Sequence, residues 1–302
     1  AAAGQAQPEH GAATAGAPPD GRPWYLYSAA PMIHQSELAF RLTAVHYGAT
    51  ATWTQMYMAD DLLQNQDVYE TARRALELGR AAPANLDVVT RARAPQVVQL
   101  AGCDPEALAL AARKISPWAD GVDLNLGASD YPEIFGSHAK GCPQRRAQEG
   151  HYGAYLLSRR DWPLVEQLSK SALSGCPCSL TISPALARAT DLPVSTKLRL
   201  CDNAQDTPEL AVRLAGAGAR LVTLHARHVA PNRRRARAAK LEYVRDTVEA
   251  LRTHGMHASC AGGRTVVLSN GNVRAFSDVA DIYRQQAVSY THLRAHETRG
   301  NL

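Results

Sequence analysis

The sequence predicts an α/β protein of the TIM-barrel class, a (β/α)₈ barrel that is incomplete at its eighth unit. Short apolar segments with strand character alternate seven times with amphipathic segments, as a parallel α/β fold requires. No Gly-rich nucleotide-binding fingerprint follows the first strand, which favours a barrel over a doubly wound sheet. The chain has 302 residues, of which 45% are hydrophobic, so it can bury the core of such a barrel.

The first half of the chain supplies four expected strands. Aromatic and apolar residues at 24–29 form the first strand, which Pro31 ends. Residues 36–47 then show helical spacing, and Gly48 lies just past them. The other strands of this half are expected at 51–56, 96–101 and 121–126. The other helices are expected at 67–78, at 162–173 and after Asp104, which caps a helix beginning with Pro105 and Glu106.

The second half supplies three more strands, expected at 194–200, 221–225 and 266–270. Its helices are expected at 241–251, at 277–284 and after Thr207, which caps a helix with Pro208 at its first position. No apolar strand follows Arg284, so the eighth strand is expected to be absent. The chain accordingly divides into a disordered tail at 1–22, a barrel domain at 23–286 and a tail at 287–302 that is foreign to the barrel.

Composition and charge exclude some classes of protein. No apolar run reaches the length of about 18 residues that a membrane span needs. The 6 cysteines lack framework spacing and no N-x-S/T acceptor occurs, which favours a reducing compartment: the cytoplasm, and also the nucleus. Residues 1–150 carry 12 basic and 16 acidic side chains, whereas residues 151–302 carry 21 and 12. The basic half predicts a polyanionic partner, RNA rather than a membrane.

Polar residues collect where the predicted strands end. In a barrel, function resides at the carboxyl ends of the strands. One polar residue there is usually a satisfied structural group, but several together predict a ligand with many hydrogen-bonding groups. A cysteine close to several glycines on the loop after the fourth strand is placed for chemistry rather than packing. The residues at these ends are Pro31, Met32, Gln99, Asn125, Cys142, Lys197, Arg199, His225, Arg227, Asn270, Gly271 and Asn272.

Several motifs along the chain resemble those of one family, and they occur in that family's order. They read AAPMIHQSELAFR, VVQLAG, DLNLG followed later by CPQRRAQEGHYGAYL, PVSTKLRL, LVTLHARH and VVLSNGNVRAF. The chain resembles the flavin-dependent tRNA-dihydrouridine synthases, and most of all the eukaryotic subclass acting on D-loop uridines 16/17. The resemblance implies FMN as cofactor, NADPH as reductant, tRNA as partner and a monomer. It also implies that the family's C-terminal helical domain is absent and that this chain is an inactive fragment.

The resemblance also assigns roles to residues. Cys142 is the general acid that protonates C5 of uracil, because a thiol is still protonated at neutral pH. Lys197 suits a reduced flavin, because its ammonium stabilises negative charge near N1. The residues that line the FMN site are Pro31, Met32, Gln99, Lys197, His225, Asn270, Gly271 and Asn272. Those that contact the substrate are Asn125, Arg199, Arg227, Arg233, Arg234 and Arg235.

Three segments depart from the family pattern: 128–141, which precedes the catalytic cysteine, 175–187 and 254–263. His34 also stands where the family usually has an acidic residue. The His254-x-x-His257-x-x-Cys260 run lacks the paired spacing of a zinc site, so no metal is expected. Two other functions remain open: an FMN oxidoreductase of the dihydroorotate dehydrogenase type, and a non-catalytic RNA-binding module.

Overall fold

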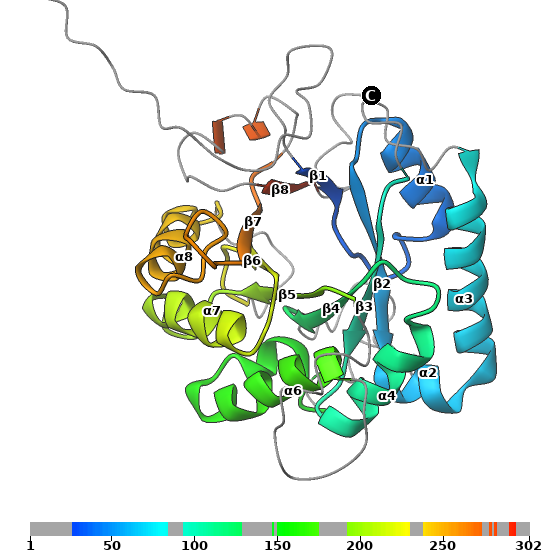
Figure 1. Ribbon diagram of the computed structural model, residues 1–302, viewed down its shortest axis with the longest axis horizontal. Coiled ribbons are helices and arrows are strands. Elements are labelled where there is room, and N and C mark those ends of the chain that lie inside the picture. Colours follow the sequence, from blue (N-terminus) through cyan, green and yellow to red (C-terminus); the bar gives the residue numbers. More distant parts are fainter. Residues whose placement is uncertain are drawn as a thin grey trace, which may run out of the picture.

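Eight parallel strands follow one another in chain order and close into a barrel, with helices around it (Figure 1). The computed structural model describes residues 26–83, 93–128, 147, 150–174, 192–229, 238–273, 278–279, 281–282 and 290–293. Each strand is hydrogen-bonded in parallel to the next, and β8 is bonded to β1. The predicted barrel class is confirmed.

The elements have the following bounds. The strands are β1 (Leu26–Ala29), β2 (Ala51–Met58), β3 (Gln96–Ala101), β4 (Gly121–Leu126), β5 (Val194–Arg199), β6 (Leu221–His225), β7 (Val266–Asn270) and β8 (Tyr290–Leu293). The α-helices are α1 (Leu38–His46), α2 (Ala59–Gln64), α3 (Gln66–Ala81), α4 (Pro105–Ile115), α6 (Trp162–Ser174), α7 (Thr207–Gly216) and α8 (Glu242–Thr253). Short 3-10 helices are η2 (Gly153–Leu156), η3 (Arg159–Asp161) and η5 (Ala204–Asp206).

The predicted elements match these bounds closely. Strands β3, β4, β6 and β7 have the predicted limits, and the short helix α2 was not predicted. Asp104 caps α4 as expected, accepting a hydrogen bond from the N–H of Glu106 at 2.9 Å. The cap predicted at Thr207 is wrong, because this residue is the first of α7 and its hydroxyl accepts from the N–H of Cys201 at 3.0 Å.

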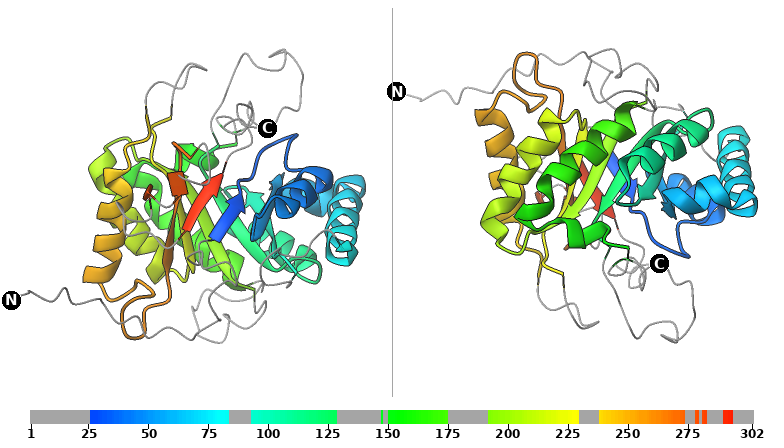
Figure 2. Two further views of the ribbon diagram at one scale, coloured as in Figure 1. Left: turned by 90° about the horizontal axis from the view of Figure 1, so that it is seen from above. Right: turned by 90° about the horizontal axis from the view of Figure 1, so that it is seen from below.

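The eighth strand was predicted to be absent, and this part of the prediction is wrong. Residues 290–293 pair with β1 along their whole length and with β7 from Leu268 to Asn270. Figure 2 shows β8 lying beside β1. The reason is that ladder hydrogen bonds come from the main chain, so a segment without apolar periodicity can still pair with two open strand edges. Leu293 is the last residue that the structure describes, and the predicted tail at 1–22 lies outside the described residues.

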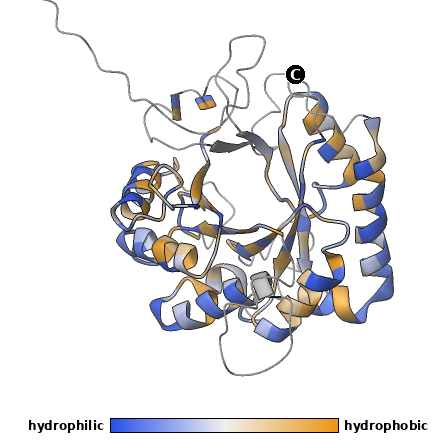
Figure 3. Cartoon of the chain, viewed as in Figure 1, coloured by the Kyte–Doolittle hydropathy of each residue, from blue (hydrophilic) through white to orange (hydrophobic). Residues whose placement is uncertain are grey.

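The apolar core lies between the strands and the helices. Alternate strand residues, such as Val98 and Leu100 in β3, pack with helix residues such as Leu108 and Ile115. Because side chains alternate along a strand, the other set faces the barrel axis. Figure 3 shows hydrophilic and hydrophobic residues alternating along the surrounding helices, as expected when each helix buries one face. The polar residues of the barrel axis are therefore separated from the apolar core.

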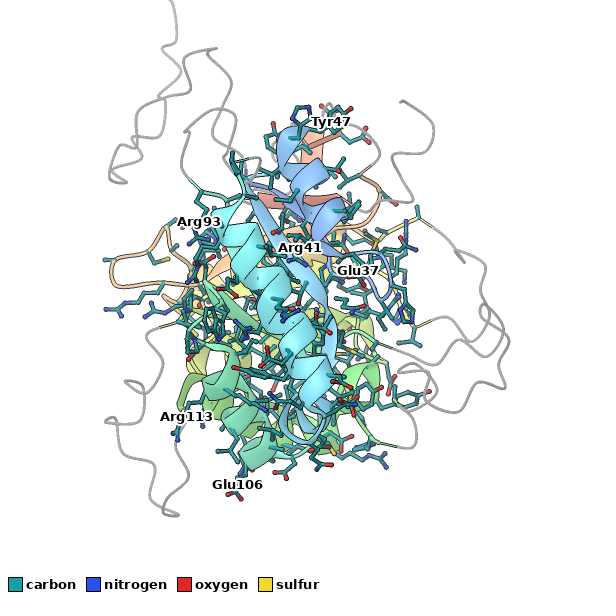
Figure 4. All side chains as sticks on the ribbon, turned by 90° about the vertical axis from the view of Figure 1, so that its right-hand side faces the viewer. Glu37, Arg41, Tyr47, Arg93, Glu106 and Arg113 are labelled. Atoms are coloured by element: carbon teal, nitrogen blue, oxygen red, sulfur yellow. The ribbon has the colours of Figure 1, made fainter. Side chains whose placement is uncertain are left out.

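A buried arginine joins the first helix to the barrel. Arg41 in α1 is 3% exposed and lies next to α3 in Figure 4. Its guanidinium donates to Ser36 O at 2.9 Å and to Gln96 Oε1 at 3.3 Å. Burial lowers the pKa of Arg41, and the nearby groups of Tyr57 and Glu37 oppose that shift. The Ser36 hydroxyl accepts from the N–H of Met32 at 2.9 Å. Because Arg41 holds Ser36 through its carbonyl oxygen, Arg41 also helps to order the loop after β1.

One of the three unusual segments is well described. Residues 254–263 form turns between α8 and β7, with the N–H of Ala258 donating to Thr265 O at 2.9 Å. His257 is buried there, its Nδ1 lies 2.8 Å from Ser259 Oγ, and burial lowers its pKa. The described residues contain no cluster of His, Cys, Asp and Glu that could hold a metal ion. The segments 129–141 and 175–187 lie outside the described residues.

No helix in the described part of the chain is both long enough and apolar enough to cross a membrane.

Candidate active site at the carboxyl ends of the strands

The strand register brings the predicted site residues together. Asn125 in β4 pairs with Lys197 in β5, and Arg199 in β5 pairs with His225 in β6, which pairs with Asn270 in β7. Residues that pair across parallel strands point to the same side, here the barrel axis. Gln99 lies within β3 on the same side, and Pro31, Met32, Arg227, Gly271 and Asn272 follow β1, β6 and β7. Cys142, Arg233, Arg234 and Arg235 lie outside the described residues.

The predicted site residues at the carboxyl ends of the strands are called the rim of the barrel below. A carboxylate that was not predicted as a site residue lies beneath this rim. Asp123 of β4 is fully buried, and its two oxygens accept from Gln99 Nε2 at 2.6 Å and from Ser195 Oγ at 2.5 Å. Burial raises the pKa of Asp123 to about 6, while hydrogen bonds from Ser195 and Gln99 and the positive charge of Lys197 act in the opposite direction. This carboxylate is therefore held by Gln99, one of the predicted site residues, and by Ser195 within β5.

Asn125 joins Gln99 to the loop that follows β4. Its Nδ2 donates to Gln99 Oε1 at 2.8 Å, and its Oδ1 accepts from the N–H groups of Gly127 and Ala128 at 2.9 and 2.8 Å. Asn125 is partly exposed, whereas Gln99 is buried. The side chain predicted to contact substrate thus also orders the start of the loop that leads to Cys142.

That loop is closed at its base by a backbone hydrogen bond. The N–H of Ala154 donates to Ala128 O at 2.7 Å. Gly153 allows this approach, because it has φ +68° and a Cβ there would lie 2.6 Å from Ala128 O. The chain therefore leaves the barrel at Ala128 and returns beside it, whatever the length of the segment between them.

The loop after β6, which carries the predicted basic cluster, is closed in the same way. The N–H of Lys240 donates to Ala226 O at 2.7 Å. Arg199 connects the two loops, donating to Gly127 O at 3.0 Å and to His228 O at 3.4 Å. Arg199 is 7% exposed, so in this structure it supports the rim from within.

Cationic and amide groups gather after β6 and β7. Arg227 donates to Asn272 Oδ1 at 2.9 Å and lies 3.4 Å from His225 Nε2. Asn272 also bonds both backbone groups of Ala239, so it holds this arrangement together. Gly271 has φ +108°, and a Cβ there would meet Ala239 Cβ at 2.9 Å and His225 Cδ2 at 3.2 Å. The region combines positive charge with close backbone approach, as anion-binding sites do.

The residues missed from the sequence are those inside the strands. Asp123, Ser195 and Thr223 face the barrel axis, and their strands were interpreted as buried apolar segments. One signal was present: a carboxylate in the middle of the apolar strand GVDLNL must find hydrogen-bond partners to be buried.

Comparisons with known proteins show which family the chain resembles. The family model described as Dihydrouridine synthase (Dus) matches residues 28–289. The NAD(P)(+) tRNA-dihydrouridine(16/17) synthase of Saccharomyces cerevisiae is 29% identical over 263 residues, which cover 86% of this chain and 49% of that protein. A Mus musculus protein named as tRNA-dihydrouridine(16/17) synthase-like is 28% identical over 250 residues, covering 83% of this chain and 41% of its own. This chain spans about half the length of these curated relatives.

A solved structure shares the fold. The structure of a variant of NCR from Zymomonas mobilis superposes with a TM-score of 0.54 at 8% identity, covering 89% of this chain and 81% of that one. At this identity the likeness concerns the barrel alone. The family match extends over most of the chain and includes every described site residue, and the chain therefore belongs to the dihydrouridine synthase family.

Proposed function

We propose that this chain forms the catalytic barrel of an FMN-dependent, NADPH-driven enzyme that reduces uridine to 5,6-dihydrouridine at positions 16/17 of the tRNA D-loop. The observation that carries the proposal is the convergence of Gln99, Asn125, Lys197, His225 and Asn270 at one end of the barrel of a dihydrouridine synthase family member. The names of the relatives from Saccharomyces cerevisiae and Mus musculus support the same substrate.

The described residues fit an FMN. The Thr223 hydroxyl is buried on the barrel axis beside Lys197 and has no hydrogen-bond partner among the described residues, as expected where a polar group is to be bound. A phosphate suits the region of His225, Arg227 and Gly271, where Arg227 supplies positive charge and Gly271 places no side chain between its backbone and His225. The residues that would hold the cofactor are Pro31, Met32, Gln99, Lys197, His225, Asn270, Gly271 and Asn272.

The reaction needs a hydride at C6 of uracil and a proton at C5. Reduced FMN supplies the hydride when it is bound. Cys142 donates the proton, because a thiol with a pKa of about 8.5 is protonated at neutral pH. Asn125 orients the uracil, which must leave any base stack to reach the rim. Lys197 stabilises negative charge beside the cofactor.

The substrate side of the proposal rests on basic residues. Arg233, Arg234 and Arg235 contact tRNA phosphates, and these contacts contribute affinity without reading sequence. A backbone hydrogen bond from the N–H of Lys240 to Ala226 O holds both ends of their loop at the rim. Arg199 and Arg227 assist from within by holding the loops in place.

The experiment is a pair of measurements on the purified chain. Its visible absorption spectrum after reconstitution with FMN reports flavin binding, and dihydrouridine formation in a tRNA transcript with NADPH reports activity. We expect a yellow protein whose Cys142→Ala variant retains flavin but loses about 10²-fold or more in rate.

The outcomes separate the alternatives. A chain that binds flavin and oxidises dihydroorotate or reduces orotate, but does not reduce tRNA uridine, belongs to the dihydroorotate dehydrogenase type. A colourless chain that binds tRNA, with affinity unchanged by Cys142→Ala, is an RNA-binding module. A chain that binds neither flavin nor tRNA is an inactive fragment, and each of these results contradicts the proposal for this chain.

A further inference from the structure

Three side chains form a hydrogen-bonded relay across β3 and β4. Asp123 accepts from Gln99 Nε2 at 2.6 Å, and Gln99 Oε1 accepts from Asn125 Nδ2 at 2.8 Å. Asn125 Oδ1 then accepts from the N–H groups of Gly127 and Ala128. The relay runs from a buried carboxylate to the first residues of the loop after β4.

The groups at the two ends of the relay allow its hydrogen bonds to run in only one donor-to-acceptor direction. An ionised carboxylate only accepts hydrogen bonds, and a backbone N–H only donates. A side-chain amide can be turned to exchange its oxygen and nitrogen. Turning Gln99 would set its oxygen against Asp123, and turning Asn125 would set its amino group against the N–H groups of Gly127 and Ala128. Neither amide can turn without losing its bonds.

This direction determines what Asn125 offers to a ligand. An amide side chain has two N–H donors and an oxygen that accepts two bonds. Within the described residues, the relay uses both acceptor positions of Asn125 and one of its donors. One N–H remains on a partly exposed side chain at the rim. A ligand that reaches this side chain therefore meets a donor.

We propose that Asp123 is a specificity-positioning residue, which through Gln99 holds Asn125 so that a substrate base meets an N–H donor and not a carbonyl oxygen. The proposal rests on the proposed function. Uracil presents carbonyl oxygens at carbons 2 and 4, which accept from such a donor. Both bases share the carbonyl at carbon 2, so the discrimination comes from carbon 4: there cytosine presents an amino group, which would face the Asn125 donor with a donor of its own. The relay thus favours uridine over cytidine at this position.

The direction of the relay can be reversed by exchanging two residues. Asn125→Asp keeps an acceptor for Gly127 and Ala128 but sets a second acceptor against Gln99 Oε1. Gln99 cannot turn in response, because Asp123 would then face its oxygen. When Asp123→Asn is added, the new amide can donate to a turned Gln99, and Gln99 can donate to the carboxylate introduced at position 125.

Thermal unfolding of the four proteins tests the direction. We expect Asn125→Asp to lower Tm by roughly 5 °C, because it leaves two acceptors facing each other in a partly buried site. Asp123→Asn alone should lower Tm less, because its amide can still turn its oxygen to Gln99 and donate to the Ser195 hydroxyl. The double variant should regain at least half of the loss caused by Asn125→Asp. A double variant that loses the sum of the two single losses would overturn the relay.

Asn65 provides a matched control. Its Oδ1 accepts from the N–H groups of Asp67 and Val68 at 3.0 and 3.3 Å, the same local pattern as at Asn125. Asn65 is exposed at the start of α3, where an aspartate is an equally good cap. Asn65→Asp should leave Tm unchanged within about 1 °C.

Steady-state kinetics separate specificity from stability. In the double variant the ligand meets an acceptor, so KM for a tRNA transcript should rise about tenfold although Tm recovers. Recovery of KM together with Tm would show that Asp123 only stabilises the fold, and would overturn the specificity role. If the wild-type chain reduces no tRNA uridine, the proposed function fails, while the Tm comparison still decides whether the relay exists.

Discussion

At the scale of single residues, Asp123 shows how apolar neighbours in sequence can conceal a polar side chain on the barrel axis. It stands between apolar residues that pack against the helices, yet its side chain lies on the barrel axis beneath the rim. A charged group in such a place is retained only when hydrogen bonds stabilise it. Ser195 and Gln99 provide those bonds from the two neighbouring strands.

The pKa of Asp123 predicts a pH dependence of stability. Its folded-state pKa, about 6, is above its ordinary value of 3.8, so the folded chain binds this proton more tightly than the unfolded chain. The resulting contribution to the free energy of unfolding is complete below pH 4 and is lost as the pH rises through 6. The loss is roughly 3 kcal/mol.

Urea unfolding of the wild type and of Asp123→Asn between pH 4 and 7 measures this effect. The variant has no titrating group at the site, so its stability relative to wild type should increase over that range. A difference between the two proteins that stays constant with pH would show that Asp123 ionises normally.

At the scale of elements, α3 shows a tertiary contact overriding a local preference. Gly79 lies inside this helix, where alanine ordinarily stabilises by about 1 kcal/mol. A Cβ at Gly79 would collide with Gln96 Oε1 and would lie 3.0 Å from Leu38 Cδ1. Gln96 cannot move freely, because it bonds Arg41 and Leu76 O in the buried region between α1 and α3.

We therefore expect Gly79→Ala to destabilise the chain by about 1–3 kcal/mol, which urea unfolding would measure. Gly216→Ala is the matched control, because a Cβ there would lie 3.7 Å from Met256 Cε, an ordinary contact, at the end of α7. The control should be neutral or stabilising. Equal effects of the two changes would contradict the role of Gln96.

The loop after β4 is the second case at this scale. A backbone hydrogen bond from the N–H of Ala154 to Ala128 O joins the two ends of this loop. The extra residues ahead of Cys142 come between these two ends in sequence and do not take part in that bond. Deleting 129–141 should change the free energy of unfolding by less than about 1 kcal/mol, because loop length enters only logarithmically. Gly153→Ala, which would push a Cβ against Ala128 O, should cost about 1 kcal/mol or more. A deletion as costly as the glycine change would show that the extra residues support the barrel.

At the scale of the whole molecule, closure of the barrel depends on the four residues of β8. Without them, β1 and β7 would each present an unpaired edge. A chain ending at residue 289 should lose roughly 10 °C in Tm and form aggregates. A chain ending at Leu293 keeps all eight strands and should match the full chain in both respects. Thermal unfolding and size-exclusion chromatography of the two truncated chains would decide, and equal behaviour would mean that β8 contributes nothing to closure.

The sequence by itself determined the barrel class and the positions of most elements. Hydrophobic periodicity, caps such as Asp104 and glycines such as Gly48 act locally, and they can be recognised without knowledge of the fold. It also identified the residues at the strand ends, because chain order alone places these ends together in a parallel barrel.

Only the tertiary structure decided what these residues bond. The eighth strand depends on two open edges far away in sequence, and its own residues carry no apolar pattern. Strand register decides which groups bond Asp123 and which loops Arg199 contacts from within the barrel. It also decides which backbone groups join the ends of the loops after β4 and β6. Hydrogen-bond direction is a property of pairs of groups, and those pairs exist only once the barrel has closed.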